Sequence, residues 1–329
     1  MHWDAILKKY PFKIEQTDSN SFLCDMRNSQ AKREEYRSLG KGYYHFCTDG
    51  QQGALIFNNE CQYAFGMLML GLVSVKFGIR IYAFTIMPNH IHIILGGTGE
   101  DCLSVFDFLK RKLSLRLVRD GYAPLPDEYW FKLVPIETDD QMRTEIVYVL
   151  RNCLEDGLAM VGGYPWSSSW LYHSPVSKMV GGVPAGQISG REMARLLLGR
   201  ETLPLDYLVH TVIGLHPASF VDMSLVLRLF PEPKDLQTAL VKDYELYFQI
   251  ARRLGEIQKF NKTEILSIVS QTLQKHFSGR ELRYLSEEDK GKMVIILSRD
   301  FGLNSYQIST SIFVKEKTVR QLLSSKELK

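Results

Sequence analysis

The chain has 329 residues, of which 45% are hydrophobic and 23% are charged, so its composition is that of a globular protein and excludes a largely disordered one. A net charge of +3 permits nucleic-acid binding only through local basic patches. Five cysteines without a CxxC pair argue against a structural zinc site and a disulfide framework. The start lacks the apolar core of a signal peptide, and no uncharged apolar run reaches membrane-spanning length, so we expect a cytoplasmic protein without a membrane partner.

The first part of the chain changes character near Gly42. Residues 1–40 are polar and charged, and we expect a solvated leader or a short helix whose Lys and Arg side chains could touch a DNA backbone. Tyr43–Thr48 predicts a first strand, on which His45 is expected to contact DNA or a neighbouring residue rather than a metal. Asn58 then fits the N-cap of a helix over about 59–77.

The next stretch, Ile81–Gly97, is rich in β-branched and apolar residues and predicts a strand that Gly96-Gly97 closes. His90 and His92 lie two residues apart within it, so the period of a strand points both imidazoles to one face. Two neutral imidazoles on a rigid strand form half of a site for a divalent metal. The same pair also fits two histidines on a half-polar strand, so other residues must decide between these interpretations.

Leu103–Val118 repeats apolar residues at helical spacing and carries a basic opposite face. That face is either solvated or a surface that contacts phosphates, because Lys and Arg neutralise backbone charge without reading sequence. Its basic side chains are Lys110, Arg111, Lys112, Arg116 and Arg119. A loop over Pro124–Trp130 and a strand over Trp130–Ile136 are expected to follow.

Thr138-Asp139-Asp140 predicts the cap of a further helix, which carries Tyr148 and Asn152. At about 100° per residue these two side chains lie only about 40° apart, on the side opposite the apolar stripe. That stripe comprises Ile146, Val149, Leu150, Cys153 and Leu154. Taken alone, this placement predicts a surface or partner-facing tyrosine, one of 16 in the chain.

The remainder is expected to be a linker over 176–190, a helical region over 191–277 and three short helices at the end. Ser286 is expected to cap the first of these helices, Ser305 opens the second and Val314–Leu323 supplies the third. Their order and the basic last helix predict a helix-turn-helix, although three-helix bundles without DNA binding are also common. The side chains expected to face a DNA groove are Lys315, Lys317, Thr318 and Arg320.

Three motifs together resemble a known family. Met87–His92 (MPNHIH) is similar to the histidine–hydrophobic–histidine motif of the HUH nucleases, and Tyr148 with Asn152 matches the tyrosine and amide pair of their tyrosine transposases. Tyr164–Ser168 (YPWSS) matches the block that follows in the REP-associated tyrosine transposases, or RAYTs. The resemblance covers Gly42 to about Tyr172, and it departs from the family at Cys153, where proline is usual.

This resemblance implies an α+β fold, with an antiparallel sheet and packed helices in a ferredoxin-like HUH nuclease domain, followed by an all-helical C-terminal region. The implied boundaries are a leader over 1–40, the nuclease domain over 41–175, a linker and helical accessory region over 176–280, and a DNA-binding domain over 281–329. It implies a homodimer that cleaves and transfers single-stranded, hairpin-bearing DNA through a covalent 5′-phosphotyrosine link.

The resemblance also implies the roles of individual residues. Tyr148 would be the nucleophile, and His90, His92 and Asn152 would hold Mg²⁺ or Mn²⁺, which suits a mixed nitrogen and oxygen site with open positions. The residues expected to bind DNA are Lys110, Arg111, Arg116, Lys315, Lys317 and Arg320. Trp166 and Trp170 could stack on bases, although a core role is favoured.

Three other interpretations stay open. A histidine-triad nucleotide hydrolase would need a third alternating histidine where Ile94 stands, which disfavours it. A regulator that keeps the transposase fold and binds DNA without cutting it has no chemical need for the whole set of site residues. A nuclease acting on RNA could use the same residues.

Overall fold

The structure is a computed structural model, and it describes residues 30–48, 55–155, 162–241, 250, 253–254 and 262–324. The chain forms two compact units, residues 1–240 and 241–329. This division differs from the expected one, because residues 183–215 pack with the first unit and residues 262–276 pack with the C-terminal helices. Within the described part of the chain, the helices are too short or too polar to cross a lipid bilayer.

The first unit is built around a four-stranded antiparallel sheet with the strand order β2-β3-β1-β4. Two helices connect its strands, in the chain order β1-α3-β2-β3-α4-β4 of a ferredoxin-like fold. The predicted α+β class with an antiparallel sheet is therefore confirmed. The bounds are β1 Gly42–Thr48, α3 Glu60–Phe77, β2 Arg80–Ile86, β3 Ile91–Gly97, α4 Gly99–Arg119 and β4 Phe131–Ile136.

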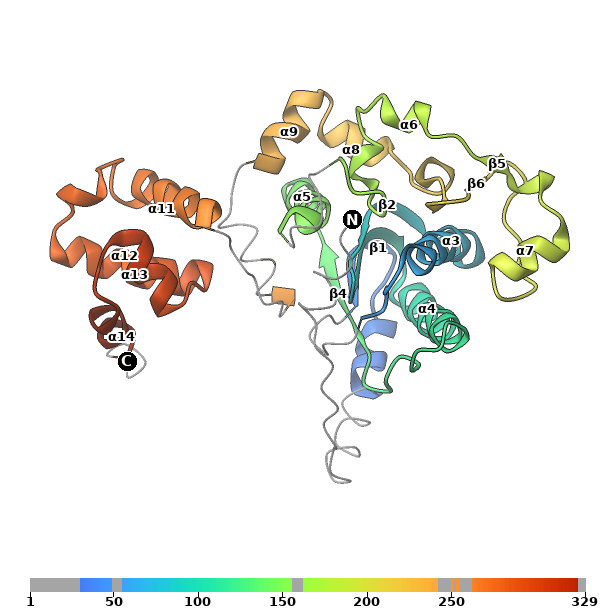
Figure 1. Cartoon of the computed structure of the whole chain (residues 1–329), viewed down its shortest axis with the longest axis horizontal. Helices are drawn as coiled ribbons and strands as arrows, with labels where there is room; N and C mark the ends of the chain where they lie inside the picture. Colours follow the sequence, from blue (N-terminus) through green and yellow to red (C-terminus); the bar gives the residue numbers. More distant parts are fainter. Residues whose placement is uncertain are drawn as a thin grey trace. The chain divides into compact units, whose positions relative to one another are not determined.

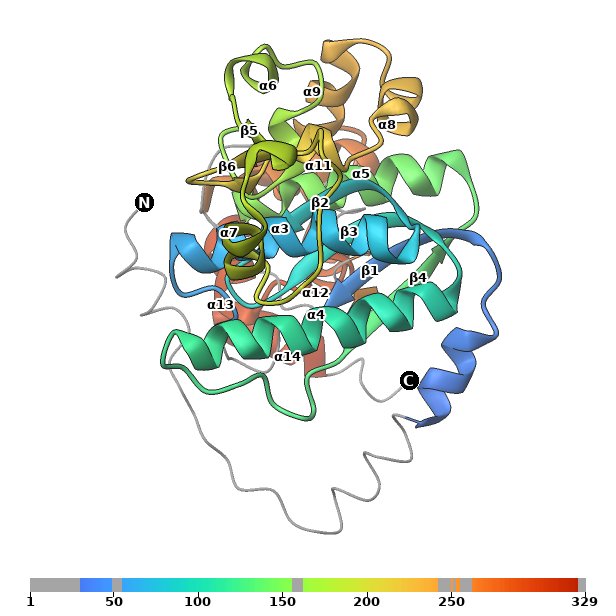
Figure 2. The ribbon, with the colours of Figure 1, turned by 90° about the vertical axis from the view of Figure 1, so that its right-hand side faces the viewer.

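Helices cover both faces of this sheet (Figure 1). α3 and α4 run side by side on one face, as Figure 2 also shows, and α5 (Asp139–Glu155) lies on the other. Neighbouring side chains of a strand point in opposite directions, so successive residues of β1 contact the helices on opposite faces of the sheet. Phe46 stacks on Phe131 on the α4 side, whereas the preceding residue, His45, reaches α5.

Capping residues set the starts of these helices. The side chain of Asn59 accepts a hydrogen bond from the amide of Gln62, so the N-cap of α3 is Asn59 and the expected Asn58 is wrong by one position. Thr98 caps α4 in a capping box. Thr138 accepts a hydrogen bond from the amide of Gln141 at 3.2 Å, as a cap of α5 does.

The expectation of one strand over Ile81–Gly97 is wrong. The segment is a hairpin of β2 and β3, and Met87 and His90 close its turn with a hydrogen bond from N to O of 2.8 Å. Pro88 lies inside the turn, where its missing N–H does not interrupt a ladder. His92 belongs to β3, but His90 precedes that strand, so the strand period does not place the two imidazoles on one face.

The Tyr164–Ser168 block lies along the outer edge of β2. The amide of Ile86 donates to the carbonyl of Trp166 at 2.9 Å, and Thr85 forms an isolated bridge with Ser167. Trp166 and the following Trp170 are buried, as their favoured core role requires. The block therefore pairs the edge strand of the sheet, which would otherwise expose unpaired backbone groups.

Residues 176–241 are more structured than expected. A second sheet with the order β5-β6-β7 packs its last strand on α3, so neither the predicted linker nor the wholly helical region is correct. Gly214 allows this close approach, because its φ is +83° and a Cβ there would lie 1.9 Å from the carbonyl oxygen of Ala64. The bounds are α6 Val176–Met179, β5 Val183–Pro184, α7 Gly190–Leu196, β6 Leu208–His210, β7 Gly214–Leu215, α8 Ser224–Leu229 and α9 Pro233–Val241.

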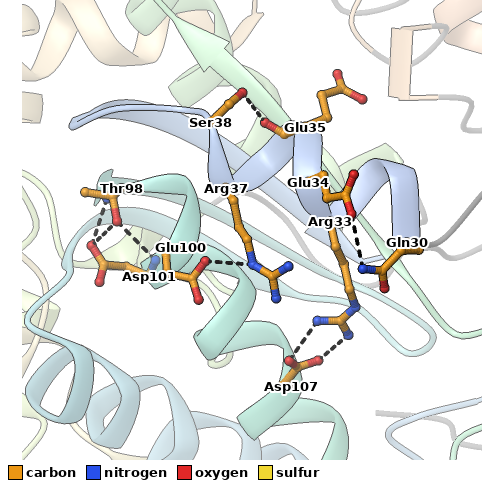
Figure 3. A network of polar contacts seen from close by, with 10 residues as sticks. All are labelled: Gln30, Arg33, Glu34, Glu35, Arg37, Ser38, Thr98, Glu100, Asp101 and Asp107. Atoms are coloured by element: carbon orange, nitrogen blue, oxygen red, sulfur yellow. Dashed lines mark hydrogen bonds and ion pairs between the residues drawn. The ribbon is translucent and has the colours of Figure 1, made fainter.

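A helix over residues 30–37 docks on α4 through ion pairs (Figure 3). Arg33 forms a bidentate pair with Asp107 at 2.7 and 3.0 Å, and Arg37 contacts Glu100 at 3.1 Å. These arginines, which were expected to be solvated or to touch DNA, hold the helix against the first unit instead. The rest of the predicted leader, residues 1–29, lies outside the described residues.

The second unit contains the three predicted C-terminal helices and a fourth that packs with them. Ser286 caps its helix as predicted, and a capping box at Asn304 starts the next. A buried cluster that includes Ile268, Leu297 and Ile308 joins the helices. The bounds are α11 Lys262–His276, α12 Glu287–Phe301, α13 Ser305–Ile312 and α14 Glu316–Ser324.

Candidate active site

A polar cluster lies between the sheet and α5. His45 comes from β1, His92 comes from β3, and Glu145 and Tyr148 come from α5. The register pairs His45 with Ile94 and Cys47 with His92, so both histidines point to the face that α5 covers. On α5, Glu145 and Tyr148 are three residues apart and therefore share one side of the helix.

Glu145, His45 and His92 form a continuous chain of hydrogen bonds. Oε2 of Glu145 lies 2.7 Å from Nδ1 of His45, and Nε2 of His45 lies 3.0 Å from Nδ1 of His92. Both histidines are completely buried, and Glu145 is 2% exposed. Burial, and after it the neighbouring imidazoles of His90 and His45, lowers the pKa of His92 well below its ordinary value, so His92 is neutral at pH 7.

His90 lies beside this chain of hydrogen bonds. Its ring centroid is 4.7 Å from that of His92, with the planes at 83°. Nδ1 of His90 is 2.8 Å from Oδ1 of Asn89, whereas its buried Nε2 has no hydrogen-bond partner within the described residues. The turn thus brings the two predicted histidines together, although the strand period was not the reason.

Tyr148 contacts the histidine cluster with its ring. The ring centroids of Tyr148 and His92 are 5.5 Å apart, and those of Tyr148 and His45 are 5.8 Å apart, both in edge-on arrangements. Tyr148 is 1% exposed, so the expectation of a surface or partner-facing tyrosine is wrong. The reason is that α5 is buried on its polar side as well as at Ile146, Val149, Leu150 and Cys153, since the polar side faces the sheet.

Asn152 lies one turn beyond Tyr148 and is also buried. Its Nδ2 donates to the carbonyl oxygen of Tyr148 at 2.9 Å, which directs the amide along its own helix. Its Oδ1 is the atom that could bind a metal. The structure brings His90, His92 and Tyr148 into ring contact, and it places Asn152 on the same side of α5.

One group of the site, Nε2 of His90, is suited to bind a divalent metal. A buried imidazole nitrogen without a partner, as in His90, is stabilised when a cation binds it. Among the described residues, no three His, Cys, Asp or Glu side chains are grouped so that they alone could hold an ion. A further protein ligand beside His90 and His92 would therefore be an oxygen of another kind, such as the amide oxygen of Asn152.

The basic residues of α4 predicted to contact DNA differ in their surroundings. Nζ of Lys110 donates to the carbonyl oxygens of Asp127 and Tyr129, and Arg116 pairs with Asp120 at 2.8 Å. Lys112 is buried against Glu201, so the predicted basic face is partly internal. Arg111 is exposed, as are Arg119 and two apolar neighbours, Leu115 and Val118.

In the second unit, the predicted DNA-binding residues lie in and just before α14. Lys315 and Lys317 are exposed, and Arg320 is exposed while it pairs with Glu316 at 2.7 Å. Phe313, the C-cap of α13, adopts a left-handed conformation and is 84% exposed. This turn presents two lysines and an aromatic ring to solvent, which are the residue types that bind phosphates and bases.

No protein-family model matches the chain, and no curated protein matches it. The solved structure of a REP-associated tyrosine transposase bound to a REP hairpin is similar over 44% of this chain and 84% of that one. The identity is 19% and the TM-score is 0.34, so this similarity assigns no function.

Sequence reasoning missed the part that Glu145 plays in the cluster. The signal was its position three residues before Tyr148, on the same side of the helix as Tyr148 and Asn152. His45 was expected to contact DNA or a neighbouring residue, and the structure pairs it with Glu145 and His92. His45 and Glu145 are 100 residues apart in the sequence, so their contact depends on how α5 packs against β1.

Proposed function

We propose that the chain is a metal-dependent nuclease and strand transferase that cuts single-stranded DNA with Tyr148 as the nucleophile. The observation that supports this most is the contact of the Tyr148 ring with the buried histidine cluster, 5.5 Å from His92. His92 in turn lies against His90, whose Nε2 is available to a cation. The substrate, single-stranded DNA with a hairpin-bearing repeat, follows from the resemblance of the three motifs to RAYTs.

In the proposed reaction, the phenol oxygen of Tyr148 bonds to the scissile phosphorus and the bond from phosphorus to the 3′ oxygen breaks. Tyr148 loses its proton, and the departing strand gains one as a free 3′-OH. The product is a 5′-phosphotyrosyl link, which a 3′-OH of another strand can attack in the reverse reaction. No external energy source is needed, because one phosphodiester replaces another.

His90 and His92 would hold the cation through Nε2, with Asn152 as an oxygen ligand. A bound Mg²⁺ or Mn²⁺ would polarise the phosphate and stabilise the phenolate of a tyrosine, whose ordinary pKa of about 10 makes it a weak nucleophile at pH 7. The residues of the chain orient the reaction. α5 carries Tyr148 to the imidazoles, and the burial of the cluster excludes water that would compete with the 3′-OH.

The test is a gel assay for a covalent adduct. Wild type and Tyr148→Phe are each incubated with Mn²⁺ and a labelled single-stranded DNA or RNA, and the labelled protein is separated under denaturing conditions. We expect an adduct of wild type with DNA, and binding without an adduct for Tyr148→Phe. An adduct with RNA alone would identify an RNA nuclease, and an equal adduct in the variant would exclude Tyr148 as the nucleophile.

A second candidate is a protein that binds DNA without cutting it. Burial favours it, because a nucleophile must reach a phosphate and Tyr148 is only 1% exposed. The exposed Lys315 and Lys317 would supply the contacts to the DNA backbone. In this case wild type binds DNA and forms no adduct with either nucleic acid. Removing either lysine should then reduce the slope of the logarithm of the binding constant against the logarithm of the salt concentration by about 1, the value for one lost phosphate contact.

A further inference from the structure

We propose that Glu145 and His45 are positioning residues, which fix the tautomer of His92 so that its Nε2 carries a lone pair for the cation. The inference rests on the proposed function, since the cation is the one placed at His90 and His92. Neither Glu145 nor His45 belongs to the three motifs, so the motifs assign these two residues no role.

The carboxylate of Glu145 sets the proton positions of both histidines. In its ionised form Glu145 can only accept hydrogen bonds, and in that form the 2.7 Å contact with Nδ1 of His45 requires a proton on that nitrogen. A neutral imidazole has one N–H, and Nε2 of His45 is then an acceptor. The 3.0 Å contact between this nitrogen and Nδ1 of His92 therefore requires the proton to be on Nδ1 of His92.

The consequence lies at the other side of the His92 ring. With its proton on Nδ1, neutral His92 has a bare Nε2, which is the form that binds a metal. The two hydrogen bonds also hold the ring in place, as partners behind a metal-binding histidine commonly do. If His45 instead carried two protons, it would donate to His92 and place the His92 proton on Nε2, where it would block the cation.

His90 shows the same arrangement with a different partner. Oδ1 of Asn89 can only accept, so Nδ1 of His90 carries the proton in the 2.8 Å contact. Its Nε2 is then bare, and this nitrogen has no hydrogen-bond partner within the described residues. Both histidines of the motif are thus set to the same tautomer, one by an amide and the other by the pair of His45 and Glu145.

The first experiment determines the tautomer without metal. The full-length protein is labelled with ¹⁵N-histidine and kept in a chelator, and long-range ¹H–¹⁵N spectra distinguish a protonated Nδ1 from a protonated Nε2. The signals of His92 are assigned by their loss in His92→Asn. We expect the proton on Nδ1 of His92, and a proton on Nε2 would overturn the inference whatever the activity of the protein.

The second experiment compares two substitutions of His45. In His45→Gln the amide oxygen can still accept from Nδ1 of His92, whereas His45→Phe keeps a ring of similar size without an acceptor. We expect the affinity for Mn²⁺, measured by calorimetry, to fall about 10–100-fold in His45→Phe and to stay close to wild type in His45→Gln. Equal affinities in wild type and His45→Phe would contradict the inference, as would equal losses in the two variants.

The two failures can be told apart. If wild type does not bind Mn²⁺, the proposed metal site is wrong, while the tautomer of His92 still supports or overturns the role of Glu145 and His45. Thermal melts of both His45 variants identify any loss of folding. The spectrum of wild type needs no substitution at His45, so the inference can fail even if both variants unfold.

Discussion

Thr85 ties the helix that carries Tyr148 to the edge strand of the sheet, and Thr85→Val tests this tie. Oγ1 of Thr85 lies 2.7 Å from the carbonyl oxygen of Val149 and 3.0 Å from Oγ of Ser167, and the side chain is completely buried. Valine keeps the shape and suits a strand, but it cannot hydrogen-bond. The buried carbonyl of Val149, the residue after Tyr148, then loses its contact with β2.

The loss of a buried hydrogen bond of this kind costs about 1–3 kcal/mol. A mid-range loss of about 2 kcal/mol lowers the melting temperature of a unit of this size by about 4–8 °C. Differential scanning calorimetry measures the shift. The matched control is Thr144→Val on the same helix, where the hydroxyl donates to the carbonyl of Asp140 at an exposed position and the expected change is within about 0.5 kcal/mol. Equal shifts for Thr85→Val and Thr144→Val would refute the role given to the buried tie.

Three further predictions concern other parts of the first unit. Gly99→Ala should release the helix over 30–37 and speed its cleavage by trypsin, because the new Cβ would lie 1.8 Å from a carbonyl oxygen of that helix; unchanged cleavage would contradict the docking. Burial raises the pKa of Cys102 to about 12, so a thiol reagent at pH 8 should modify the exposed Cys61 first and Cys102 only after unfolding, as peptide mapping would show. The pKa of His92 is below 6.5 in the folded state, so between pH 7 and pH 5 the unfolded chain binds a proton at His92 and the folded chain does not. The free energy of unfolding should therefore fall as the pH is lowered from 7 to 5. Urea titrations that show no such fall would be inconsistent with a neutral His92.

The sequence predicted α3, α4, β1 and β4 well, because each gives a clear local signal. Helix α4 carries apolar residues at helical spacing, α3 is a long apolar segment that starts at an N-cap, and β1 and β4 are short β-rich runs between turns. The hairpin at Pro88 was missed because β-branched residues continue on both sides of its turn. The strands β6 and β7 have three and two residues, too few to show any period.

The site was only partly predictable for a related reason. The motifs identified His90, His92 and Tyr148, which the structure places in contact, but a helical wheel misjudged the environment of Tyr148. A wheel distinguishes polar from apolar sides, and it cannot show that a polar side faces a polar patch of a sheet. The hydrogen bonds of His45 depend on strand register and helix placement, which are set by contacts far apart in the sequence.

The most direct measurement is the identity of the residue that becomes linked to DNA. Wild type is incubated with Mn²⁺ and single-stranded DNA, the covalent product is digested with protease and nuclease, and mass spectrometry locates the nucleotide on the peptide. The proposed function predicts a 5′-phosphate on Tyr148. A nucleotide on any other of the 16 tyrosines, or no linked peptide where DNA is bound, would contradict it.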